Sequence, residues 1–107
     1  MALPIEIYRS EHQKINFEVT NPQNEARDLS GDVEVWFYVS DQLPANVLHI
    51  EKECVITDAK DGLVEIELDE EETDLATGLY YYSVIVKYPN GNNYNGGIGR
   101  FFVKKVI

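Results

Sequence analysis

The sequence has little cysteine and no long apolar run, and each scarcity excludes a class of protein. Its 107 residues include one cysteine, Cys54, which has no partner for an intramolecular disulfide. Small secreted domains usually carry several disulfides, so we expect a protein that folds in a reducing cytoplasm. No apolar run approaches the ~20 residues of a membrane-spanning helix, and residues 1–9 lack the basic and apolar regions of a signal peptide. We therefore expect a soluble protein that is stabilised by packing.

Basic side chains are also scarce, with 9 Lys and Arg against 19 Asp and Glu and a net charge of -10. Because such a surface repels phosphates, we expect no nucleic-acid partner. The charge is unevenly distributed: residues 51–74 hold 11 acids and 2 bases, whereas residues 75–107 hold 4 bases and no acid. Oppositely charged patches steer association. The split therefore predicts oriented contacts with a partner or between copies of the chain.

Alternation of apolar and polar residues with period two dominates the sequence and predicts β-strands. Between the apolar runs, Asp61-Gly62 predicts a tight hairpin, and residues 89–97, with two Asn-Gly pairs, predict a hairpin loop. About seven or eight short strands with no long amphipathic helix predict an all-β, antiparallel sandwich in a single domain over residues 1–107. The expected strands cover residues 5–8, 15–20, 33–40, 48–56 (as one or two strands), 63–68, 79–88 and 98–106.

The residue types that carry catalysis or bind metal do not form a motif. The acidic run Asp69–Asp74 lacks the alternating acids and central glycine of a calcium loop, so we expect a solvated connection. His12 and His49 have no neighbouring cysteine and are expected at the surface rather than in a zinc site. Cys54 is in phase with apolar neighbours and is expected in the core. We expect no enzymatic activity, cofactor or metal, because a sandwich this small leaves little room for an enclosed cleft.

Four large side chains predict a binding surface. Alternation places Trp36 and Tyr38 on one face of their strand, and Tyr81 and Ile85 on one face of a later strand. If these two strands are neighbours, the four side chains form an apolar patch outside one sheet, which marks an interface. Two alternatives stay open. The aromatic residues, joined by Tyr94, would serve as a platform for carbohydrate, or a loop or chain terminus would cover the patch and turn it into a second small core.

A local motif resembles a known structural corner. The segment from Asp74 through Gly78 and Tyr80 to Tyr82 is similar to the Asp-x-Gly-x-Tyr corner that opens strand F of immunoglobulin-like sandwiches, with two extra residues before the glycine. The resemblance implies that the hydroxyl of Tyr80 bonds to the backbone upstream. Antibody domains have a disulfide cysteine where this chain has Tyr82, so the resemblance implies a different kind of immunoglobulin-like domain.

A longer pattern resembles one protein family. Residues 33–40, 61–66, 78–81 and 101–103 follow the order found in the small sandwich domains at the amino end of the baseplate upper protein family of tailed phages, over residues 15–104. The resemblance implies a structural role in a baseplate, tail or capsid and a location in the virion after synthesis in the host cytoplasm. It implies binding to another virion protein or to copies of the chain. A carbohydrate-binding or cell-surface adhesion module, and a domain of a larger protein, remain alternatives.

Overall fold

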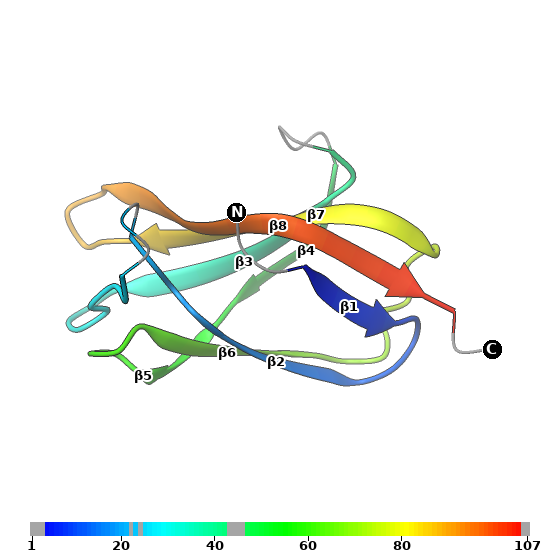
Figure 1. The fold of residues 1–107 in the computed structure, drawn as a ribbon, viewed down its shortest axis with the longest axis horizontal. Coiled ribbons are helices and arrows are strands. Elements are labelled where there is room, and N and C mark those ends of the chain that lie inside the picture. The colour runs from blue at the N-terminus through cyan, green and yellow to red at the C-terminus, as the bar shows by residue number, and fades with distance from the viewer. Residues whose placement is uncertain (1–3, 22, 24, 43–46, 106–107) are drawn as a thin grey trace.

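The computed structural model describes residues 4–21, 23, 25–42 and 47–105, which form eight strands and no helix. The strands make two sheets that face each other as two layers (Figure 1), a five-stranded sheet in the order β1-β8-β7-β3-β4 and a three-stranded sheet in the order β2-β6-β5. The prediction of an all-β sandwich is therefore confirmed. The strands are β1 (Ile5–Tyr8), β2 (Gln13–Glu18), β3 (Glu34–Ser40), β4 (Leu48–Glu53), β5 (Val55–Asp58), β6 (Leu63–Leu68), β7 (Gly78–Lys87) and β8 (Asn93–Lys104).

One strand pair corrects the prediction of a purely antiparallel sandwich. β1 runs parallel to β8, with Ile5 opposite Phe101 and Ile7 opposite Val103. Parallel neighbours cannot be joined by a tight hairpin, and here almost the whole chain separates them. After β1 the chain crosses to the three-stranded sheet, where β2 pairs with β6. The first strand thus extends the larger sheet while the second builds the smaller one.

The core lies between the two sheets and is built by the alternation that the sequence displays. On β3, Val35, Phe37 and Val39 are fully buried and face the three-stranded sheet. Cys54 is buried where the chain passes from β4 to β5 (Figure 1), as predicted. Burial, with a smaller contribution from the negative charge of Glu53, raises the pKa of the Cys54 thiol to about 12. The thiol is therefore un-ionised and inert near neutral pH.

The hairpin between β7 and β8 is shorter than predicted. β8 begins at Asn93, so the second Asn-Gly pair, Asn95-Gly96, belongs to the strand and not to the loop. It lies at a bulge, where the pairing with β7 shifts its register. A Cβ atom on Gly96 would lie 2.7 Å from a methyl group of Val19, so this glycine is needed for packing rather than for a turn. The turn itself uses Gly91, whose φ is +90°.

The acidic connection between β6 and β7 is more structured than predicted. The backbone N–H of Asp69 donates to the carboxylate of Glu72 (3.0 Å), and the N–H of Glu72 donates to the carboxylate of Asp69 (2.8 Å). Lys52 forms an ion pair with Glu72 at 2.7 Å, and Thr73 is fully buried. Reciprocal bonds of this kind satisfy free backbone donors at a tight turn. The connection is therefore anchored to the sandwich and is not a wholly solvated loop.

Candidate functional site

The four residues of the predicted patch lie on the outer surface of the five-stranded sheet. β3 and β7 are antiparallel neighbours, with Trp36 opposite Ile85, Tyr38 opposite Ser83, and Tyr81 opposite Ser40. Because the alternate residues of both strands are buried in the core, these side chains point away from it. All four predicted residues are half-buried. The structure thus brings them onto one face.

β8 adds two apolar side chains that the sequence reasoning did not include. Ile98 lies opposite Ser83, and Phe102 lies opposite Leu79, on the same outer surface. Both are half-buried. Alternation alone indicates that they point away from Phe101 and Val103, but only the pairing of β8 with β7 places them beside the patch. We call the set of outward residues Trp36, Tyr38, Tyr81, Ile85, Ile98 and Phe102 the aromatic face.

The two rings on β3 are held in place by charged neighbours. Trp36 and Tyr38 stack with their ring centroids 6.4 Å apart. The ammonium of Lys87 lies 4.9 Å from the Trp36 centroid and 6.0 Å from that of Tyr38, within the range of cation–π attraction. The indole N–H of Trp36 donates to the carboxylate of Glu34 at 2.8 Å. The indole is therefore oriented, and the ammonium occupies one of its faces.

Charges of opposite sign border the aromatic face on its two sides. On β4, Glu51 lies opposite Tyr38 and Glu53 lies opposite Trp36. On β8, Arg100 lies opposite Tyr81. Glu51, Glu53 and Arg100 are exposed, and none of them forms an ion pair within the part of the chain that the structure describes. The surface is acidic along one edge of the sheet and basic toward the other.

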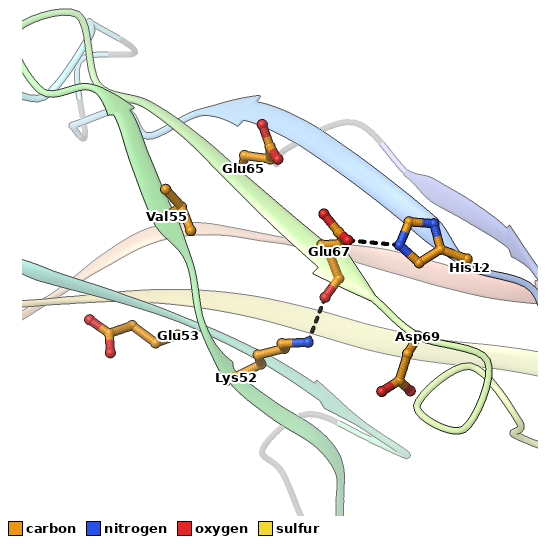
Figure 2. A pocket seen from close by; sticks show the side chains of 7 residues that line it. All are labelled: His12, Lys52, Glu53, Val55, Glu65, Glu67 and Asp69. Atoms are coloured by element: carbon orange, nitrogen blue, oxygen red, sulfur yellow. Dashed lines mark hydrogen bonds and ion pairs between the residues drawn. The ribbon is translucent and has the colours of Figure 1, made fainter.

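A cleft of about 360 Å³ is the second candidate (Figure 2). The imidazole of His12 lies 2.9 Å from the carboxylate of Glu67, and the ammonium of Lys52 donates to the Glu67 backbone carbonyl at 2.6 Å. The hydrogen bond and charge of His12 lower the pKa of Glu67. These polar groups are used by one another, so the cleft offers few of them to a ligand. Its lining consists of His12, Lys52, Glu53, Val55, Glu65, Glu67 and Asp69.

The described residues contain no group of three or more His, Cys, Asp or Glu side chains that could hold a metal ion. His12 and His49 are both exposed, as predicted. Among the same residues there is also no helix with the length and apolar character needed to cross a membrane.

The predicted corner residues lie at the start of β7. The hydroxyl of Tyr80 donates a hydrogen bond of 2.7 Å to the carbonyl of Ala76, four residues upstream. Gly78 begins the strand with a φ of +150°. Asp74 accepts hydrogen bonds from Ser10 (2.9 Å) and Arg9 (3.0 Å), which lower the pKa of its carboxyl group, so it ties the acidic connection to the segment after β1. The tyrosine and the aspartate therefore stabilise different neighbouring segments.

Replacing Tyr80 with phenylalanine is expected to lower the free energy of unfolding by about 1 kcal/mol, because the ring stays and only the hydrogen bond is lost. Urea unfolding followed by tryptophan fluorescence measures the loss. The matched control is Tyr81→Phe, since the Tyr81 hydroxyl makes no hydrogen bond within the described chain, and that variant should equal the wild type. Equal stability of the two variants would show that the bond to Ala76 contributes nothing.

Known proteins give no assignment for this chain. No protein-family model matches the sequence, and no curated protein matches it either. The function is therefore inferred from the geometry and charge of the aromatic face.

Proposed function

We propose that this chain is a non-enzymatic, immunoglobulin-like interaction domain that binds another protein through the aromatic face. The observation that carries the proposal is the clustering of half-buried Trp36, Tyr38, Tyr81 and Ile85 on one sheet. Aromatic side chains at the centre of a patch with a charged rim are the usual composition of a protein interface. A monomer gains nothing from leaving such a patch in water, because burying apolar area is favourable at roughly 25 cal/mol per Å².

The order of the strands supports the immunoglobulin-like part of the proposal. In that fold strands B, E and D share one sheet, while strands C, F and G share the other, which strand C′ can extend. Here β2, β6 and β5 correspond to B, E and D, whereas β3, β7, β8 and β4 correspond to C, F, G and C′. The bond from Tyr80 to Ala76 agrees with a tyrosine corner at the start of strand F. On this assignment the aromatic face belongs to strands C, F and G.

The setting that we propose is a tailed-phage particle, in which the chain is a component of the baseplate, tail or capsid. The support is the resemblance of residues 15–104 to domains of the baseplate upper protein family. A particle component binds permanently to neighbouring subunits, and an aromatic face with oriented rings suits such contacts. The proposed location is the virion, after synthesis in the host cytoplasm.

A protein suits the aromatic face better than a carbohydrate does. A sugar needs a free ring face to stack on, and Lys87 occupies one face of the Trp36 indole. Tyr94, which would complete an aromatic platform, lies opposite the buried Val86 and therefore on the other side of the sheet. Its ring packs against Tyr88, with the centroids 5.3 Å apart. The rings do not form one continuous platform.

Site-specific photocrosslinking in the native host tests the proposal. We would replace Glu51, at the edge of the aromatic face, with a photoreactive amino acid and irradiate cells and purified particles. We expect covalent protein adducts of defined mass, retained in the particles. The matched control places the same group at Val55, which is 65% exposed on β5 of the other sheet. No adduct from position 51, or the same adducts from both positions, would contradict an interface at this face, and absence from particles would contradict the virion setting.

A further inference from the structure

We propose that the partner of the aromatic face is a second copy of this chain, bound about a two-fold axis that runs along β7. The inference rests on the proposed function, because it names the partner of the same surface. In such an isologous contact both copies use the same residues. The strand order, the register and the unpaired charges each bear on it.

The strand order fixes which elements meet. β7 is the central strand of the five, with β8 and β1 on one side and β3 and β4 on the other. A two-fold rotation about an axis along β7 exchanges the two sides. It therefore lays β3 over β8 of the partner and β4 over the outer edge next to β8. Strand positions along the axis are unchanged by this rotation, so residues in one row across the sheet meet the same row of the partner.

The rows bring apolar side chains together. Tyr38, Ser83 and Ile98 lie in one row across β3, β7 and β8. Tyr38 of one copy therefore lies over the partner's Ile98, and the reverse contact repeats it. The small Ser83 at the centre leaves room for the two sheets to approach. Outward side chains of two sheets packed in this way interdigitate as in a sandwich core.

The charges select this axis over the alternative. Glu51 lies in the row of Tyr38, and Arg100 lies in the next row, opposite Tyr81. Exchanging the two sides of the sheet brings Glu51 toward the partner's Arg100, twice in each dimer. An in-plane axis perpendicular to the strands would instead lay β4 over β4 and face Glu51 and Glu53 with their own copies. Like charges facing each other are unfavourable, above all for a chain with a net charge of -10.

Arg100 is available for this contact because its charge is unused within the chain. Other bases pair with carboxylates of the same molecule, whereas Arg100 and Glu51 have no ion-pair partner among the described residues. Two opposite charges without partners, on the two edges of one apolar face, are complementary in a two-fold arrangement. The intramolecular pairs are Arg9–Asp74, Lys14–Glu65, Lys52–Glu72 and Lys104–Glu6.

Charge reversal tests the pairing in the complete chain. Sedimentation velocity over a wide concentration range should show a monomer–dimer equilibrium for the wild type. Arg100→Glu and Glu51→Arg should each raise the dimer dissociation constant by about tenfold or more. The double variant should restore the dimer, because it rebuilds both pairs with reversed polarity. Lys60→Glu and Glu70→Arg are the controls, since they make the same changes of charge at exposed positions away from the face, and they should dimerise like the wild type.

The outcomes separate this inference from the proposed function. A wild type that stays monomeric at all concentrations, or a double variant no more dimeric than the single ones, overturns the two-fold dimer. In that case crosslinks from position 51 to a different protein would leave the proposed function standing. A crosslinked adduct of twice the chain mass, about 24 kDa from a chain of 12.2 kDa, supports both. No adduct at all overturns the function itself.

Discussion

Replacing Phe37 with alanine is expected to lower the free energy of unfolding by about 3–5 kcal/mol. Phe37 is fully buried at the middle of β3. Its ring centroid lies 5.8 Å from that of Tyr82, 6.1 Å from Phe101 and 6.2 Å from Phe17, so it joins strands of both sheets. Alanine would remove the transfer free energy of the ring and leave a cavity that these three rings cannot all fill.

Urea unfolding measures the loss, with Val55→Ala as the control for an apolar truncation at a position that is 65% exposed. The control should change the free energy of unfolding by less than about 0.5 kcal/mol. A chain of this size has only about 5–15 kcal/mol in total. If the alanine variant does not fold, Phe37→Leu should still fold with a smaller loss. A loss from Phe37→Ala no larger than that from the control would contradict the central place of this ring.

Period-two alternation predicts the direction of most side chains. On β3 it correctly assigns Val35, Phe37 and Val39 to the core and Trp36 to the outside, because a pleated strand points successive residues to opposite faces. The same reasoning explains the apparent exception at Lys52. Its position is in phase with the core, yet on the edge strand β4 its long side chain reaches out to Glu72.

Alternation does not predict which strands are neighbours. The addition of Ile98 and Phe102 to the aromatic face depends on β8 lying beside β7, and the position of β1 depends on a parallel pairing across nearly the whole chain. Such pairings are set by long-range packing of complementary faces and not by local propensity. The start of β8 at Asn93 has the same cause, because pairing with β7 extends residues whose composition favours a turn.

The charge distribution acquires a different meaning in three dimensions. Along the chain, residues 51–74 are acidic and residues 75–107 are basic, which suggests two oppositely charged ends. In the fold, several acids of the first segment are neutralised locally, as Glu72 is by Lys52. What remains near the aromatic face is Glu51 on one edge strand and Arg100 toward the other edge of the same sheet. The polarity therefore runs across a sheet, where it favours a two-fold contact over a head-to-tail one.

Replacing Gly62 with alanine is expected to lower the free energy of unfolding by about 2–5 kcal/mol, because strain in the left-handed backbone adds to overpacking. Gly62 is buried in the hairpin between β5 and β6, with a φ of +69°. A Cβ atom there would lie 2.7 Å from the carbonyl oxygen of Arg27 and 2.8 Å from that of Val19. These are backbone atoms held in place by hydrogen bonds: the N–H of Arg27 donates to Val19, and the N–H of Val19 donates to Gly62. Neither oxygen can move away without breaking this junction.

Gly91→Ala is the matched control, since Gly91 has a φ of +90° but no atom within 4 Å of its added Cβ. It carries the backbone penalty alone and should lose only about 1–2 kcal/mol. The difference between the two variants in urea unfolding therefore isolates the crowding at Gly62. The same loss from both would mean that the segments carrying Val19 and Arg27 move apart at little cost. In that case the hairpin would owe its glycine to turn geometry alone, and the contact between three chain segments would contribute little to stability.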